Sequence, residues 1–383
     1  MAEFMAIFGF SFAFPFLSIF LNKDLGVHSG TDLYVWTAAS ASASGIALAI
    51  ASPIWGILGD RYGRKPMLVR SMLGGGITVG LIYFAQNPTE LVVLRFLQGL
   101  TSGTVAAATA LVAAETPRAR VGWSLGVVTS AVALGGAIGP VVGGLAGELF
   151  GLRLVFLVGG VLLLVALIPV LVMVRETPLL PRVGPRVGAL ALIDQQPGLR
   201  RSLTVLIAAQ GLTNLVTSAT QQLVVLRLLE MLSSGVSAVS GIGFGLAGVA
   251  SSAAAVGYTR VTRHLGYVRT SAAAAGMLAL AVLLIGAAPE VSLVVIAIGL
   301  SGLFSGVIQP ATASMIGLET PHEAQSTVFG INASSVAMGF FLGPLIGGTV
   351  AAVTSDVSSA LFVVAGLGLA LAALLSTSAR EPR

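Results

Sequence analysis

Four charged side chains lie within six positions of the stretch WGILGDRYGRKPML at 55–68, although charged residues make up only 9% of the chain. They are Asp60, Arg61, Arg64 and Lys65. A carboxylate among cationic groups forms charge-assisted hydrogen bonds, and Gly63 between them permits a tight turn that a residue with a Cβ resists. The spacing therefore predicts a polar turn whose charges hold neighbouring elements together.

A further charge is unusual because of where it lies. Arg95, in LRFLQG at 94–99, is the only formal charge well inside an apolar stretch. An arginine at such a position is costly and usually functional. The alternative is an arginine that extends to the membrane surface, because Glu90 lies just outside the stretch.

The composition indicates which elements must position these charges. Hydrophobic residues make up 56% of the 383 residues, whereas soluble domains usually carry about 25% charged residues. Charge-poor apolar stretches recur at 4–22, 33–59, 71–87, 96–114, 121–147, 154–174, 202–226, 231–257, 270–288, 291–316, 327–353 and 357–376. Each is near the ~20 residues that cross a bilayer as a helix and is too long for a barrel strand. We therefore predict an all-α membrane protein with twelve transmembrane helices.

The distribution of the 20 Lys and Arg residues predicts the orientation. With a cytoplasmic N-terminus, only Lys23, Arg153 and Arg227 fall at the outer side, and nearly all the others fall in cytoplasmic segments. This bias follows the positive-inside rule, so we expect both termini in the cytoplasm and the chain in the lipid bilayer of the cell membrane. The net charge of +5 is then an orientation signal, and no basic module indicates nucleic-acid binding. The absence of cysteine excludes disulfides and thiolate metal sites.

The chain contains an internal repeat. A proline- and arginine-rich interruption at 175–201 predicts a cytoplasmic linker between six-helix bundles at 1–174 and 202–383. The stretch ETPRARVGWSLGVVTSAVALGGAIGPVVGG, from Glu115, is matched by ETPHEAQSTVFGINASSVAMGFFLGPLIGG, from Glu319. Because each half holds an even number of helices, the halves are predicted to be parallel repeats, an arrangement of secondary transporters with a site between the halves.

The opening stretch matches a family signature. The pattern G-x-L-x-D-R-x-G-R-[RK] is present as Gly56, Leu58, Asp60, Arg61, Gly63, Arg64 and Lys65. With this match and its twelve-helix organisation, the chain resembles the major facilitator superfamily. The resemblance implies that these charges latch the cytoplasmic side while the transporter faces outward. The corresponding stretch TRVTRHLGYVR at 259–269 keeps Gly266 but has Arg263 in place of Asp60, so any latch there must differ.

Two more motifs narrow the resemblance. LRFLQG looks like the family's fourth-helix motif, and GxxxGPxxGG is typical of its drug–proton antiporters; the latter consists of Gly135, Gly139, Pro140, Gly143 and Gly144. Glycine at every fourth position permits close helix contact, which ordinary helix packing also uses, and Pro140 bends the helix. The chain is similar to the multidrug exporters grouped around MdtG. This implies a monomer that exports amphipathic drugs by proton antiport with alternating access.

The family architecture places the first, fourth, seventh and tenth helices around the substrate cavity. The candidate substrate-binding residues on or near them are Phe12, Phe16, Arg95, Gln98, Gln210, Asn214, Gln309 and Asn332, with Gln221 and Gln222 as further amides. Aromatic walls with a few polar groups suit an amphipathic ligand. The alternative role of the amides is hydrogen bonding between helices.

Proton antiport needs a group that exchanges a proton for substrate, and burial raises the pKa of a carboxylate toward that role. No acid lies deep in a predicted helix. Asp32, just before the second helix, and Glu115, at the inner end of the fourth, remain as candidates. Their alternative roles are an interfacial acid and a helix-end charge partner. Arg95 offers another route, because a buried cation can bind an anionic substrate group or hold a carboxylate.

Other functions have less support. The three histidines, His28, His264 and His322, lie outside the apolar stretches, and HExxH and GxSxG are absent. We therefore expect no enzyme, no cofactor and no metal site. A sugar or metabolite exporter of the same superfamily is the main alternative, and a membrane sensor that does not transport is a more remote one. Sugar sites usually need more hydrogen-bonding groups, which favours a drug-like substrate.

Overall fold

The computed structural model describes residues 1–383 except 29, 118–119, 177–197, 322–323 and 382–383. Twelve helical spans in it are long and apolar enough to cross a membrane, which confirms the prediction. The described residues contain no strand. The predicted linker at 175–201 lies largely outside the described residues.

The helices form two groups that follow one another along the chain. The first contains α1 (Ala2–Ala13), η1 (Phe14–Phe16), α2 (Leu17–Lys23), α3 (Gly30–Tyr62), α4 (Arg64–Leu81), η2 (Ile82–Phe84), α5 (Pro88–Thr101), α6 (Thr104–Glu115), α7 (Val121–Phe150) and α8 (Leu152–Met173). The second contains α10 (Leu199–Met231), α11 (Val236–Leu265), α12 (Tyr267–Ala287), α13 (Val291–Glu319), α14 (Gln325–Thr354) and α15 (Val357–Ser378).

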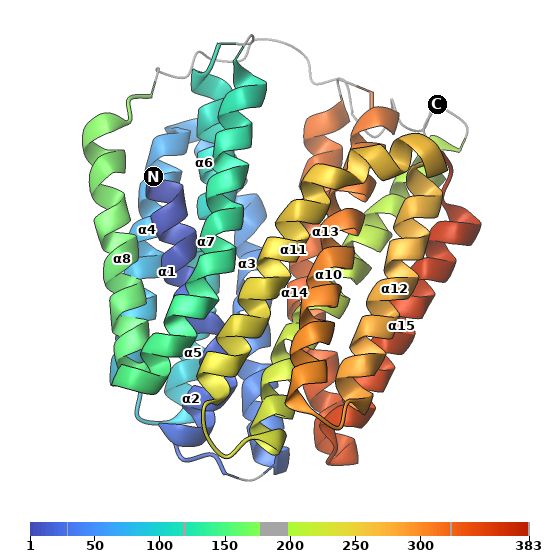
Figure 1. Ribbon diagram of the computed structural model, residues 1–383. Helices are drawn as coiled ribbons and strands as arrows, with labels where there is room; N and C mark the ends of the chain where they lie inside the picture. The colour runs from blue at the N-terminus through green and yellow to red at the C-terminus, as the bar shows by residue number, and fades with distance from the viewer. Residues whose placement is uncertain (29, 118–119, 177–197, 322–323, 382–383) are drawn as a thin grey trace.

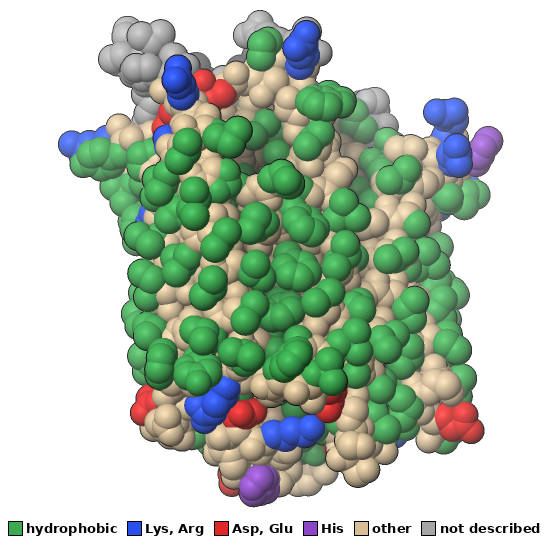
Figure 2. Space-filling model, turned by 60° about the vertical axis from the view of Figure 1, so that its left-hand side comes forward, with side chains coloured by type: hydrophobic (Ala, Val, Ile, Leu, Met, Phe, Trp, Pro, Cys, Tyr) green, Lys and Arg blue, Asp and Glu red, His purple; other side chains and the backbone are tan. Residues whose placement is uncertain are grey.

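The lateral surface is apolar. Hydrophobic side chains cover it in a broad band, and charged side chains gather at its two ends (Figure 2). Large side chains such as Leu149, Val172 and Val256 are exposed. Soluble monomers rarely expose a continuous apolar patch of more than a few hundred Å². The chain is therefore a multi-pass membrane protein.

Two of the spans are interrupted along their length. The first passes through the 3-10 turn η1 at Pro15, which lacks a backbone N–H. The fourth breaks between α5 and α6, where Gly103 has φ +120° and the guanidinium of Arg70 donates to the carbonyl of Ser102 at 3.1 Å. Non-helical backbone at membrane depth is tolerated where it lines a cavity or is buried in protein. Both breaks therefore mark the interior of the molecule rather than its lipid-facing side.

The two bundles diverge toward the end that holds both chain termini and converge at the opposite end (Figure 1). We call these the termini end and the far end. Across the interface α3 packs on α14, and α7 packs on α11. A Cβ at Gly45 would lie 2.7 Å from backbone atoms of Phe341, and one at Gly144 would collide with the carbonyl of Ser237. Glycine at these positions lets the bundles touch, and the far end is closed.

Candidate functional site

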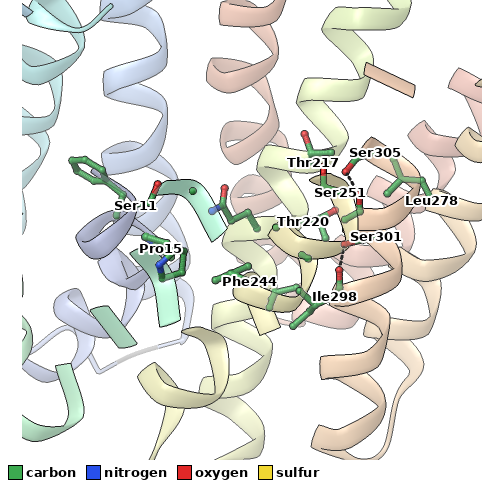
Figure 3. A pocket seen from close by; sticks show the side chains of 18 of the residues that line it. Ser11, Pro15, Thr217, Thr220, Phe244, Ser251, Leu278, Ile298, Ser301 and Ser305 are labelled. Atoms are coloured by element: carbon green, nitrogen blue, oxygen red, sulfur yellow. Dashed lines mark hydrogen bonds between the residues drawn. The ribbon is translucent and has the colours of Figure 1, made fainter. Parts of the chain in front are cut away.

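A cavity of about 790 Å³, the main chamber, lies between the bundles. Its walls come from α1, η1, the start of α2, α3, α5 and the start of α6 on one side and from α10 and α14 on the other. A side chamber of about 350 Å³ extends between α10, α11 and α13 (Figure 3). Both chambers are lined by Phe10, Ser11, Phe14, Pro15 and Gln221, so they adjoin along the break in the first span. Such largely apolar walls suit a ligand that gains from apolar burial.

Arg95 is buried and lines the main chamber. Its Nε donates to the carbonyl of Ser40 at 3.2 Å, its Nη2 to Oγ of Ser44 at 2.7 Å, and its Nη1 to Oε1 of Gln98. The guanidinium lies over the Phe14 ring, 4.3 Å from the centroid. Glu90 instead caps the start of α5, where it accepts from the backbone of Gln86 at 2.8 Å. The side chain of Arg95 therefore points inward and does not extend toward Glu90.

Three of the candidate amides bond to one another. Gln210 donates to the carbonyl of Gln309 at 3.0 Å, Gln309 donates to Oδ1 of Asn214 at 3.3 Å, and Asn214 donates to the carbonyl of Gln210 at 3.0 Å. These bonds join α10 to α13, and neither chamber is lined by the three amides. Asn332 is also buried outside both linings. Of the candidate amides, Gln98, Gln221 and Gln222 line the main chamber.

The aromatic wall comes from residues that the sequence analysis did not select. Phe12 and Phe16 are buried outside both linings, whereas Phe10 and Phe14 line both chambers and stack with centroids 5.7 Å apart. The four-residue spacing of Phe10 and Phe14 places them on one helix face. Pro15 was the feature of the sequence that could have identified them, because the break it causes in the first span determines which helix face lines the cavity.

The charged signature at 56–65 is built around a capped helix start. Gly63 has φ +107° and precedes α4. The backbone N–H groups of Arg64 and Lys65 donate to the carboxylate of Glu176 at 2.6 and 3.0 Å, and Nζ of Lys65 donates to the carbonyl of Val174 at 2.6 Å. A carboxylate at a helix N-terminus satisfies free N–H groups and the helix dipole. The chain following α8 thereby clamps the start of α4.

Two other residues of the signature are Arg61 and Gly56. The guanidinium of Arg61 lies 5.3 Å from the centroid of the Tyr62 ring, and Gly56 faces open space. The side chain of Asp60 lies outside the described part of the structure.

The second half repeats this clamp although its sequence motif is degenerate. Gly266 has φ +83°, and the backbone N–H groups of Tyr267 and Val268 both donate to the carboxylate of Glu381 at 2.9 Å. The sequence analysis missed Glu176 and Glu381. Their signal was the dipeptide Arg-Glu that follows the last helix of each half, at 175–176 and 380–381.

The α7 motif presents two packing faces. A Cβ at Gly135 would lie 2.9 Å from backbone atoms of Phe4 and Phe8, and one at Gly139 would lie 2.7 Å from Cβ of Ser11. Gly143 packs in the same way on the carbonyl of Phe12. This face lies against α1, within the first bundle. On the other face, Pro140 and Gly144 pack on Gly241 of α11 in the second bundle.

Polar contacts add to the closure of the far end. The hydroxyl of Tyr34 on α3 donates to Oε1 of Glu230 on α10 at 2.8 Å. The backbone N–H of Ser237, at the start of α11, donates to Oε1 of Glu148 on α7 at 3.0 Å. The Oγ of Ser42 donates to the carbonyl of Phe341 at 3.0 Å. Each of these three bonds joins one bundle to the other.

Two carboxyl groups near the far end have shifted pKa values. Burial raises the pKa of Asp24, and Arg153, 3.5 Å away, opposes the shift. The hydrogen bond from the hydroxyl of Ser359 lowers the pKa of Asp356, which caps α15. Both groups stabilise loops and helix starts outside the chambers.

The candidate proton-coupling acids lie at opposite ends. Asp32 is exposed in the first turn of α3 at the far end, and Glu115 is exposed at the last residue of α6 at the termini end. Neither lines a chamber. Glu3, which the sequence analysis passed over, is buried in the first turn of α1, and both its carboxylate oxygens lack a hydrogen-bond partner among the described residues. Its position directly before the first apolar stretch could have identified it as an acid at the end of a membrane span.

The sequence has relatives along its whole length. The family model described as Major Facilitator Superfamily matches residues 1–285 and 237–383. The "Multidrug resistance protein MdtG" of Dickeya zeae is 31% identical over 90% of this chain and 84% of that protein. The "Multidrug resistance protein MdtG" of Proteus mirabilis is 42% identical, but the match covers 44% of this chain and 42% of that protein.

Solved structures share the fold. The crystal structure of the nucleoside transporter NupG superimposes with a TM-score of 0.78 over 99% of both chains, at 15% sequence identity. At this identity the likeness concerns the fold alone.

Proposed function

This chain belongs to the major facilitator superfamily, and we propose that it exports amphipathic small molecules across the cell membrane by alternating access. The observation that carries the proposal is a cavity between two bundles with a closed far end and aromatic and apolar walls. A site at the interface of two repeats is the arrangement that lets the bundles rock around a bound molecule.

The termini end is the cytoplasmic side in this proposal, because the positive-inside bias places most Lys and Arg residues there. The described conformation is then inward-facing. Substrate enters the main chamber from the cytoplasm or the inner leaflet. The contacts of Tyr34, Ser42 and Glu148 separate when the far end opens to the outside. The charges of Asp60, Arg61 and Arg64 hold the cytoplasmic ends together in that outward-facing state.

The cavity favours an amphipathic molecule over a sugar. Gln210, Asn214 and Gln309 each donate a side-chain hydrogen bond within their own group of three, and none of them lines a chamber. The exposed surface of the main chamber is largely apolar and includes the three aromatic rings of Phe10, Phe14 and Phe340, although hydroxyl and amide side chains are interspersed in its walls. A sugar loses its hydration shell on entry and needs many replacement hydrogen bonds, whereas an amphipathic molecule needs few.

We assign the driving force to protons, as in the antiporters with the α7 motif. Asp32 and Glu115 are the proposed proton carriers, and Glu3 joins them because its carboxylate is buried in the first turn of α1. A carboxylate of this kind takes up a proton in one state and releases it when the conformational change exposes it to water.

A transport assay tests this function. The purified protein is reconstituted in liposomes, and cationic, neutral and anionic fluorescent amphiphiles are followed with and without an imposed pH gradient. We expect the pH gradient to drive accumulation of at least one class of amphiphile. At least one of the variants Asp32→Asn, Glu115→Gln and Glu3→Gln should abolish this dependence on the gradient. Glu290→Gln, an exposed acid at the far end, is the matched control. Movement that ignores the gradient would exclude antiport, and no movement of any class would exclude the exporter.

A further inference from the structure

We propose that the substrate is an amphipathic organic anion, held at its anionic group by Arg95 in the main chamber and at a hydrogen-bond donor group by hydroxyls of the side chamber. This inference rests on the proposed transport function and adds the substrate class to it.

Arg95 keeps two N–H donors for a ligand. A guanidinium has five N–H groups, and three are used by Ser40, Ser44 and Gln98, all of them neutral partners. One N–H remains on each of Nη1 and Nη2. Such a pair suits the two oxygens of one carboxylate or phosphate group. Because Phe14 covers one face of the guanidinium, the ligand meets its edge.

Within the cavity, no carboxylate offsets this charge. Among the described residues that line the two chambers, Arg95 alone carries a formal charge. A charge taken out of water without an opposite charge is unfavourable, and an anionic ligand removes that penalty. The same charge repels a lipophilic cation. The cavity therefore selects an anion over a cation of the same shape.

The side chamber presents hydrogen-bond acceptors. The hydroxyls of Thr217, Thr220, Ser301 and Ser305 each donate to a carbonyl of their own helix, at 3.0, 2.7, 2.7 and 3.1 Å. A hydroxyl that has donated its one proton keeps acceptor lone pairs. Figure 3 shows these residues on two helices around the chamber, with Ser11 and Pro15 on the opposite side. An N–H or O–H of a ligand finds acceptors there.

The two polar regions are joined by an apolar wall. Phe10, Phe14 and Pro15 belong to the lining of both chambers. The cavity therefore fits a ligand whose apolar body connects an anionic group, bound near Arg95, to a hydrogen-bond donor group, bound in the side chamber.

The test is a binding measurement that does not depend on transport. The probe is dansylaminoundecanoic acid, which has a carboxylate at one end and a sulfonamide N–H at the other, added to the purified protein in detergent at neutral pH. Its methyl ester, its ammonium analogue and its N-methyl sulfonamide remove one feature each. We expect the ester and the ammonium analogue to bind about 10- to 100-fold more weakly than the acid, because a hydrogen bond to a charged group is lost.

Variants test whether the anionic group binds in the main chamber and the donor group in the side chamber. Arg95→Gln should reduce acid binding to the level of the ester and leave ester binding unchanged, while Arg263→Gln, which removes an exposed charge outside both chambers, should change neither. Thr220→Val with Ser305→Ala should weaken the N–H probe about 2- to 10-fold and leave the N-methyl probe unchanged. If Arg95→Gln does not fold, the comparison of acid, ester and ammonium probes on the unchanged protein still decides the ligand charge.

Equal binding of acid, ester and ammonium probes would overturn the anion site. Equal weakening of the N–H and N-methyl probes in the double variant would overturn the donor site. If the acid binds as expected but never crosses the membrane of liposomes, the binding inference stands and the transport function fails.

Discussion

The carboxylates of Glu176 and Glu381 occupy equivalent places in the two halves. Each accepts two backbone N–H bonds at the start of a helix, α4 or α12, directly after a glycine with positive φ. The charged motif is preserved only in the first half, whereas the clamp is preserved in both. The shared part therefore has a structural role, and the charges unique to the first half are available for gating.

The first prediction concerns Gly63. A Cβ there would lie 2.7 Å from Oε2 of Glu176, and its backbone angles of 107° and 160° belong to a region open almost only to glycine. Gly63→Ala should lower the free energy of unfolding by about 1–3 kcal/mol, measured as thermal unfolding in detergent. Gly56→Ala, in the same motif but facing open space, is the control and should have little effect. Equal stability of the two variants would contradict the clamp.

For single residues, the sequence predicted a place in the cavity correctly where the residue type is unusual for its surroundings. Arg95 stood out as a charge inside an apolar stretch, and it lines the main chamber. Phe10 and Phe14 did not stand out, because many phenylalanines occupy the first span and the break at Pro15 decides which of them face inward. Partners far apart in sequence, such as Lys65 and Glu176, depend on packing that no local pattern encodes.

At the scale of elements, the twelve spans followed from hydropathy because each must satisfy its backbone as a helix in lipid. The predicted stretch at 4–22 agrees with the span Ala2–Lys23, and that at 357–376 with Val357–Ser378. The breaks at η1 and Gly103 were not predicted, because hydropathy is the same for an interrupted and a continuous span; the residues Pro15 and Gly103 themselves were the available signal. The contacts between α3 and α14 depend on the conformational state, which hydropathy does not report.

The second prediction concerns the far-end contact between α3 and α10. Tyr34→Phe removes the hydrogen bond to the carboxylate of Glu230 that joins the bundles. A bond to a charged group contributes about 1.5–3 kcal/mol, so its loss should shift the population toward the outward-facing state. The chain has no cysteine, so a single cysteine at Ala333, in the main chamber, reports access. Its labelling by an impermeant maleimide from the far side should become several-fold faster.

Tyr258→Phe is the matched control for this experiment. Its hydroxyl bonds to Ser314 at 2.9 Å, but this bond joins α11 to α13 within one bundle. Labelling should stay unchanged in this variant. If labelling became similarly faster in both variants, the loss of any tyrosine hydroxyl would be loosening the fold. Tyr34 would then not be a contact that holds the far end closed.

Among the described residues, the two bundles meet at the far end through close glycine contacts and through polar bonds that include those of Tyr34, Ser42 and Glu148. Each of these bonds contributes only about 1–3 kcal/mol, so in the proposed transport cycle the closed end opens when ligand or proton binding favours the other state. The central claim is that this one cavity opens in turn to either side of the membrane.

Two distances measured by electron spin resonance on spin-labelled cysteines test that claim most directly, in liposomes with and without the dansyl acid and a pH gradient. One pair, Trp123→Cys with Val261→Cys, spans the bundles at the termini end, and the other, Leu149→Cys with Val353→Cys, spans them at the far end; all four side chains are exposed. The account predicts that the termini-end distance shortens while the far-end distance lengthens. Distances that stay fixed, or that change in the same direction, would contradict alternating access.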